Sequence, residues 1–195
     1  MPASPDQLLA AGQAHHRAGN LAAAARCYQQ VLARAERHVT AWHLLGLVHA
    51  QTGDYANALV LFNRALALDP RHAEAHHDLG NLHRDRGDPD QAAACYRCAI
   101  DADATMAKAH SNLGAMLHAM GGTRGAIAAC TQALALEPGR IEAQFTLGCA
   151  LQDAGQLDEA AAVYRAVLAR QPRHGEAQAQ LAALQAECKT APPAG

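Results

Sequence analysis

Aromatic and β-branched residues are scarce in this chain. Phe, Trp and Tyr make up 4% of its 195 residues, and six Val, three Ile and seven Thr stand against 49 Ala and 23 Leu. Sheets favour β-branched and aromatic side chains, whereas Ala and Leu favour helices. The composition therefore argues against a β-sandwich, a β-barrel or an α/β sheet, and it predicts an all-α protein.

Long apolar runs and a strong charge of one sign are also missing. No stretch of about 18 apolar residues occurs, so we expect no transmembrane helix. Residues 1–16 lack a basic start followed by an apolar block, so we expect no secretory signal peptide and predict a cytoplasmic protein. The formal net charge of −2 provides no general attraction to nucleic acids or anionic membranes.

Signatures of catalysis are absent from the sequence. It contains two serines, Ser4 and Ser111, and none of the phosphate-binding, dinucleotide-binding, nucleophile-elbow or zinc-protease motifs. Cys95 and Cys98 form a C-x-x-C pair, but no second pair completes a zinc motif and no βαβ unit supports a redox role. We therefore expect no enzymatic activity, no catalytic residues and no cofactor.

The glycines that are present show how the chain is organised. Ten of the fifteen fall on two series with a period of 34 residues. The first series is Gly12, Gly46, Gly80, Gly114 and Gly148, and the second is Gly19, Gly53, Gly87, Gly121 and Gly155. A series of alanines (Ala24, Ala58, Ala92, Ala126 and Ala160) and a series of mostly large residues (Tyr28, Phe62, Tyr96, Cys130 and Tyr164) share this period. Such a fixed period is typical of repeat proteins.

These series define five repeats without insertions or deletions, at 5–38, 39–72, 73–106, 107–140 and 141–174. The first glycine is then position 8 of each repeat and the second is position 15. We predict two helices per repeat, over about positions 2–14 and 17–30, with a turn at the second glycine, which can adopt a positive φ. Residues 1–4 form an N-terminal extension, 175–189 a capping helix that is polar on its free side, and 190–195 a flexible tail. Because glycine at position 8 is costly inside a helix, we expect the large residue at position 24 to press against it.

The pattern resembles the tetratricopeptide repeat (TPR), most completely in the second repeat. The matching residues there are Trp42, Leu45, Gly46, Gly53, Ala58, Phe62, Ala65 and Pro70. The resemblance covers residues 5–174 and implies a right-handed α-solenoid of five helix pairs plus the C-terminal capping helix. Residues 75–81 and 109–114 look like repeats of the O-GlcNAc transferase type, but the catalytic region of those enzymes is absent from this sequence.

The resemblance also implies where a partner binds. In the family, the first helices line the concave face of the solenoid, and positions 2, 5, 9 and 12 share one side of such a helix. The predicted partner-binding residues on and beside this face are His43, His77, Asn81, Arg84, Lys108, Ser111, Asn112 and Phe145. We therefore expect a non-catalytic scaffold that binds a protein or peptide segment in the concave groove, without nucleic-acid or membrane partners.

An alternative function uses the same groove to recruit substrates for a separately encoded enzyme, such as a glycosyltransferase. In repeats of the O-GlcNAc transferase type, Asn at position 6 forms a ladder that holds the substrate backbone. Only Asn112 matches that position here. The sequence leaves open the identity of the partner and the oligomeric state of the chain.

Twelve histidines are many for a chain of this length. His43 and His77 are equivalent in adjacent repeats and are expected to lie close together, but no spacing fixes a set of four zinc ligands, so we predict no metal site. At position 34, His38, His72 and His174 are expected to be exposed in the turns between repeats. At position 11, where the family often has Tyr, His15, His49 and His83 are expected to be partly buried.

Overall fold

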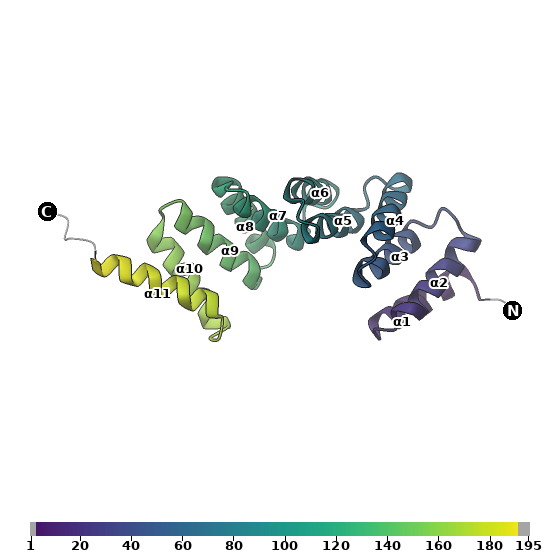
Figure 1. Cartoon of the computed structure of the whole chain (residues 1–195), viewed down its shortest axis with the longest axis horizontal. Helices are drawn as coiled ribbons and strands as arrows, with labels where there is room; N and C mark the ends of the chain where they lie inside the picture. The colour runs from purple at the N-terminus through teal and green to yellow at the C-terminus, as the bar shows by residue number, and fades with distance from the viewer. Residues whose placement is uncertain (1–2, 191–195) are drawn as a thin grey trace. The chain divides into compact units, whose positions relative to one another are not determined.

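The computed structural model describes residues 3–190, and every regular element in that range is an α-helix. In this described range eleven helices follow one another, and Figure 1 shows their order. They are α1 Pro5–Arg17, α2 Leu21–Arg34, α3 Val39–Gln51, α4 Tyr55–Leu68, α5 Ala73–Asp85, α6 Pro89–Ala102, α7 Ala107–Ala119, α8 Thr123–Leu136, α9 Ile141–Asp153, α10 Leu157–Arg170 and α11 Gly175–Thr190. These paired helices confirm the predicted all-α solenoid. Residues 1–2 of the expected N-terminal extension and 191–195 of the expected tail lie outside the described residues.

The turn inside each helix pair depends on the glycine at position 15. Gly19, Gly53, Gly87, Gly121 and Gly155 have φ angles between 75° and 79°. Residues with a Cβ avoid this left-handed region, because the Cβ approaches the following carbonyl oxygen. The glycine series at position 15 therefore sets the point at which every first helix ends and the chain reverses into the second.

The glycine at position 8 allows the two helices of a pair to come close together. A Cβ placed on Gly80 would lie 2.6 Å from Cε1 of Tyr96, and one placed on Gly148 would lie 2.5 Å from Cε1 of Tyr164. In the fourth repeat, Cys130 takes the place of the ring and faces Gly114. All five residues at position 24 are fully buried. The predicted contact between positions 8 and 24 is confirmed.

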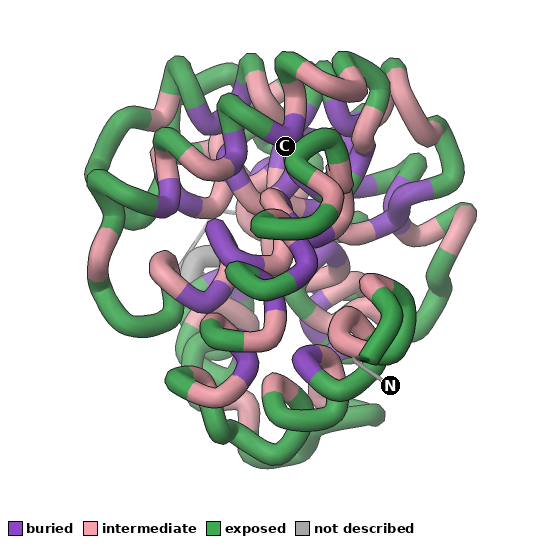
Figure 2. Tube along the Cα trace, turned by 90° about the vertical axis from the view of Figure 1, so that its right-hand side faces the viewer, coloured by how far each residue is buried: buried purple, intermediate pink, exposed green. Residues whose placement is uncertain are grey.

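Alanine is the most frequent buried residue in the described part of the chain. The residues at position 20, namely Ala24, Ala58, Ala92, Ala126 and Ala160, are fully buried. Figure 2 shows buried residues in purple along the sides of the helices and exposed residues in green in the loops. Small side chains at these positions let helix backbones approach closely, so the core needs few large residues.

The chain divides into two compact units. Residues 1–103 contain α1–α6, and residues 104–195 contain α7–α11. In the first unit each helix packs on its neighbours in the sequence, and α3 also contacts α5. In the second unit α11 packs on α10, and Ala177 and Leu184 of α11 join the core cluster that contains Tyr164 and Val167. The uniform spacing of the repeats gave no indication of this division.

A side-chain hydrogen bond recurs at the junction between one repeat and the next. The side chain at position 4 donates to the backbone carbonyl at position 32 of the preceding repeat, over 2.7–3.1 Å. The pairs are Trp42 with Glu36, His76 with Pro70, His110 with Ala104, Gln144 with Pro138, and Gln178 with Pro172. We call this contact the junction bond. Within each unit it ties the start of a first helix to the turn that precedes it.

The histidines at position 34 are not exposed, which corrects the expectation from the sequence. His38, His72 and His174 are half-buried and precede α3, α5 and α11. In each case Nδ1 accepts a hydrogen bond from the backbone N–H three residues later, over 3.2–3.3 Å. The ring is drawn over the start of the helix because it caps one of the unpaired N–H groups there.

The expectation for position 11 holds for two of its three histidines. His49 and His83 are partly buried, with Nδ1 2.9 Å from Oδ2 of Asp54 and 3.8 Å from Oδ2 of Asp88. His15 is exposed, so the expectation is wrong there. Within the described residues no helix precedes α1, so α1 lacks the covering that α3 and α5 receive from the preceding repeat.

None of the helices in the described range is both long enough and apolar enough to cross a membrane.

Candidate functional site

Three of the predicted partner-binding residues meet around one carboxylate in the first unit. His43 on α3 places Nε2 2.8 Å from Oδ2 of Asp78, and His77 on α5 places Nδ1 3.0 Å from Oδ1 of the same residue. The side-chain amide of Asn81 donates to Oδ1 of Asp78 over 3.4 Å. His43 and His77 are each 6% exposed. The two imidazoles therefore lie close together as expected, and both bond the half-buried carboxylate of Asp78.

The charge at the centre of this cluster is fixed by its hydrogen bonds. Burial alone would raise the pKa of the Asp78 carboxyl. Hydrogen bonds from His43 and His77 outweigh burial and hold that pKa well below its usual range. Asp78 is therefore ionised at neutral pH, and each imidazole directs an N–H group toward it.

Asn81 connects this cluster to the helix core. The hydroxyl of Tyr96 on α6 donates to Oδ1 of Asn81 over 2.9 Å. Because Tyr96 is fully buried, this bond holds the carboxamide in a fixed orientation at the edge of α5. Asn81 therefore serves the fold as well as the surface.

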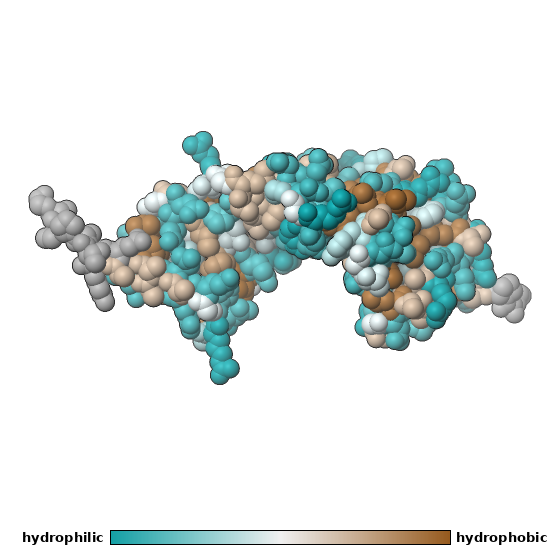
Figure 3. Space-filling view, viewed as in Figure 1, coloured by the Kyte–Doolittle hydropathy of each residue, from teal (hydrophilic) through white to brown (hydrophobic). Residues whose placement is uncertain are grey.

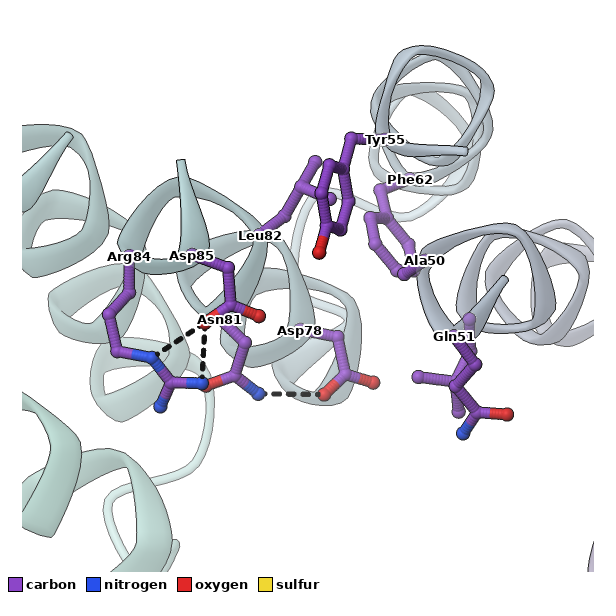
Figure 4. Close-up of a pocket in the computed structure, with 10 residues that line it drawn as sticks. Ala50, Gln51, Tyr55, Phe62, Asp78, Asn81, Leu82, Arg84 and Asp85 are labelled. Atoms are coloured by element: carbon purple, nitrogen blue, oxygen red, sulfur yellow. Dashed lines mark hydrogen bonds and ion pairs between the residues drawn. The ribbon is translucent and has the colours of Figure 1, made fainter. Parts of the chain in front are cut away.

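A pocket of about 240 Å³ opens beside the cluster, between α3, α4 and α5. Its apolar part comes from Leu47, Ala50, Tyr55, Phe62 and Leu82. Its polar part comes from Gln51, Asp78, Asn81, Arg84 and Asp85. Figure 4 shows Tyr55 and Phe62 of α4 on one side, Leu82 and Asn81 of α5 opposite, and Ala50 and Gln51 of α3 at the edge.

The polar groups around the pocket are already oriented by internal contacts. Both Nε and Nη2 of Arg84 bond Oδ1 of Asp85, over 3.0 and 2.9 Å. Gln51 accepts through Oε1 from Nε2 of His16 on α1, over 2.8 Å. With the cluster around Asp78, these bonds give the pocket a prearranged polar rim beside an apolar floor.

Apolar side chains also reach the surface near the pocket. Tyr55 is 39% exposed and Val60, also on α4, is 65% exposed, but only Tyr55 lines the pocket. Figure 3 shows apolar surface in brown where α3 and α4 lie, surrounded by polar surface in teal. Substitutions of these two residues can therefore distinguish binding in the pocket from binding to exposed apolar surface in general.

The other four predicted residues belong to the second unit. Ser111 is 4% exposed, whereas Lys108 and Asn112 on α7 are half-buried. The ring of Phe145 on α9 lies 4.9 Å from that of His174 and 6.0 Å from that of Tyr164, measured between centroids. Phe145 thus packs against the core of the second unit. Lys108 and Asn112 are the more accessible of the predicted partner-binding residues in that unit.

Several pocket residues were missed by the sequence reasoning. Tyr55 and Leu82 fall outside the positions assigned to the concave face, and Gln51 and Asp85, both at position 13, lie one residue beyond the last of them. A large aromatic residue two places after the turn glycine Gly53 was a usable signal for Tyr55.

The structure describes the side chains of residues 3–186, which include possible metal ligands and free thiols. No group of three or more His, Cys, Asp or Glu side chains in that range is arranged to hold a metal ion. Cys95 and Cys98 are free thiols on α6. Burial, followed by the neighbouring Cys98, raises the pKa of Cys95 to about 11, so this thiol stays protonated at neutral pH.

Comparison with known proteins gives consistent matches. Three family models described as tetratricopeptide repeats match residues 38–104, 77–141 and 117–188. YrrB, a TPR protein with an unusual peptide-binding site, is similar in structure with a TM-score of 0.78 and 22% identity, over 85% of each chain. No curated protein matches the sequence.

Two further structures show the same fold. MamA from Desulfovibrio magneticus RS-1 has a TM-score of 0.75 and 20% identity, over 88% of this chain and 97% of that one. TTC0263, a thermophilic TPR protein from Thermus thermophilus, has a TM-score of 0.66 and 23% identity, over 93% and 99% of the two chains. At these identities the likeness concerns the fold.

Proposed function

The chain belongs to the tetratricopeptide repeat family, and we propose from this that it is a non-catalytic scaffold that binds a protein or peptide segment. The pocket between α3, α4 and α5 is the observation that carries the proposal. Small-molecule sites usually occupy about 300–1,000 Å³. At about 240 Å³, this pocket suits one large apolar side chain of an extended segment better than a cofactor.

The rim of the pocket complements such a segment. Asn81 and Gln51 carry carboxamides, which pair well with the N–H and C=O groups of an extended backbone. Asp78 and Asn81 are held by hydrogen bonds before any partner arrives. A prearranged site loses less conformational entropy on binding, which favours affinity.

The remaining predicted residues have graded roles in this proposal. Arg84 lines the pocket directly, whereas His43 and His77 position Asp78 from inside the fold. In the second unit, Lys108 and Asn112 are the proposed contact residues, and Ser111 and Phe145 support their helices.

Selection of peptides from a random phage-displayed library on the immobilised full chain tests this function. A selected peptide, labelled with a fluorophore, is then titrated into the wild-type chain and into the Tyr55→Ala and Val60→Ala variants. Loss of a buried aromatic anchor typically costs binding about 2 kcal/mol or more, so we expect Tyr55→Ala to weaken binding at least tenfold. Val60→Ala should bind like the wild type.

Two outcomes would contradict the proposal. Failure to select any binding sequence would contradict peptide binding itself. Equal weakening by both variants would place the site on the general apolar surface of α4 instead of in the pocket. Asn81→Ala is a poorer probe, because it also removes the acceptor for the buried Tyr96 hydroxyl.

The alternative function is recruitment of substrates for a separately encoded enzyme. It draws on the O-GlcNAc transferase type of repeat, in which Asn at position 6 holds the substrate backbone. In the third repeat this position is Asp78, and both of its carboxylate oxygens are bonded by histidines. The general scaffold is therefore the better-supported function, and stable co-purification with a single enzyme would favour recruitment instead.

A further inference from the structure

Three helices in the described part of the chain begin with an imidazole cap. Nδ1 of His38, His72 and His174 accepts the backbone N–H of Ala41, Ala75 and Ala177. A nitrogen accepts a hydrogen bond only while it carries no proton, so each capping ring must be neutral with its proton on Nε2. The usual capping residues, Ser, Thr, Asp and Asn, keep their acceptor oxygen through neutral and mildly acidic pH.

Other histidines make bonds that survive protonation. His76 and His110 donate from Nε2 in their junction bonds. His43, His49 and His118 each place a ring nitrogen within 2.9 Å of a carboxylate oxygen. A protonated imidazole is still a donor and adds charge to such a pair. Protonation therefore leaves these bonds in place, whereas it removes the bond that an imidazole cap accepts.

Several titratable groups surround the His72 ring and affect its protonation. From α3, the ring of His43 lies 4.9 Å away between centroids. On α5, Oε2 of Glu74 lies 3.6 Å from Nδ1, and Asp69 precedes the ring in the turn. A positive charge at this place also opposes the helix dipole, which is positive at the N-terminus.

The balance of these groups favours the neutral ring. Burial and then the neighbouring His43 lower the pKa of His72, and Glu74 and Asp69 offset this only in part. Glu74 is 55% exposed, so water screens its attraction. When Nδ1 takes up a proton, it can no longer accept the Ala75 N–H, and it turns into a donor to the nearby carboxylate of Glu74, so the cap is lost.

We propose that His72 is an acid-sensitive helix cap whose protonation releases the start of α5. The device belongs to the free chain and does not depend on a bound partner. Through this cap, the pH of the surroundings controls how well ordered the start of α5 is.

The direction of the effect follows from proton linkage. His72 has a lower pKa in the folded chain than the unperturbed value of about 6.5 that it has when unfolded. The unfolded chain therefore binds more protons as the pH falls below about 6.5, and stability decreases. The contribution of the neutral cap is complete above that value and declines below it.

Thermal unfolding of the full chain at pH 7.5 and pH 5.5 tests this, with two matched variants. His72→Asn keeps a cap whose acceptor does not titrate in this range. His76→Gln changes a neighbouring histidine to the residue that makes the same junction bond in Gln144 and Gln178. We expect the fall in melting temperature between the two pH values to be smaller for His72→Asn than for the wild type, by about 2–4 °C. His76→Gln should show the same fall as the wild type.

A second measurement on the wild-type chain needs no variant. ¹H–¹⁵N spectra of the imidazoles should show His72 at pH 7.5 as the neutral tautomer protonated on Nε2. The Ala75 amide should lose about fivefold in hydrogen-exchange protection on moving to pH 5.5. Equal pH dependence of the melting temperature in the wild type and His72→Asn would overturn the proposal, as would a proton on Nδ1 at pH 7.5.

Discussion

In each repeat, the glycine at position 8 faces a fully buried side chain of the second helix. Gly80 illustrates this, because a Cβ there would lie 2.6 Å from Cε1 and 2.8 Å from Cδ1 of Tyr96. Tyr96 is fully buried and has little room to move. Any side chain at this position must push the two helices of the pair apart.

Replacement of Gly80 by Ala should therefore destabilise the chain by about 1–3 kcal/mol, the usual cost of overpacking a core. Gly175→Ala is the control, because a Cβ at the start of α11 meets nothing within 4 Å. It should leave stability unchanged or slightly raised, since Ala favours the helix. Urea denaturation followed by circular dichroism distinguishes the two. Equal midpoints would show that the contact between positions 8 and 24 tolerates a methyl group.

Single residues differ in how well their roles could be predicted from the sequence. The roles of the glycines followed from spacing alone, because a recurrent glycine within a helical segment implies a close contact. The roles of His38, His72 and His174 did not, because a turn residue and a cap occupy the same place in the sequence. Only the direction of Nδ1 separates them, and that direction depends on side-chain rotation.

At the scale of the helices, one hydrogen bond recurs at the junctions between repeats. In the described range, the junction bond recurs with Trp, His or Gln at position 4. These residues share an N–H group at a similar distance from the backbone. The same bond is therefore made by three chemically different donors.

His76 offers a direct test of this view. His76→Gln should leave the urea midpoint close to that of the wild type, because Gln144 and Gln178 make the same bond. His76→Ala should lose about 1 kcal/mol, the net value of a typical hydrogen bond. If the Gln variant is destabilised as much as the Ala variant, the imidazole stabilises the junction by packing and not by its N–H group.

Helix boundaries were predicted from the repeat pattern to within one residue. The second helices cover positions 17–30 as expected, and the first helices cover positions 1–13 instead of 2–14. The shift arises because position 34 of the preceding repeat is the N-cap, so the helix starts at the next residue. Position 14 then becomes the C-cap before the turn glycine.

At the scale of the whole molecule, the fold was far more predictable than the site. Period and composition determine the helical pairs, but they do not show the division after Asp103. The sequence predicted that the side chains on one face of the first helices point outward toward a partner. His43 and His77 instead turn inward and bond the half-buried, ionised carboxylate of Asp78, and the neighbouring pocket is formed by residues of α3, α4 and α5.

Chemical-shift mapping of the ¹⁵N-labelled full chain with a library-selected peptide tests the central claim of the pocket most directly. The account predicts that the side-chain amides of Gln51 and Asn81 and the backbone amide of Leu82 shift on addition of the peptide, because all three residues line the pocket. Amides on the outer side of α6, such as those of Ala94 and Arg97, should not change. Shifts confined to α6 and the other second helices, with Gln51, Asn81 and Leu82 unaffected, would contradict the account.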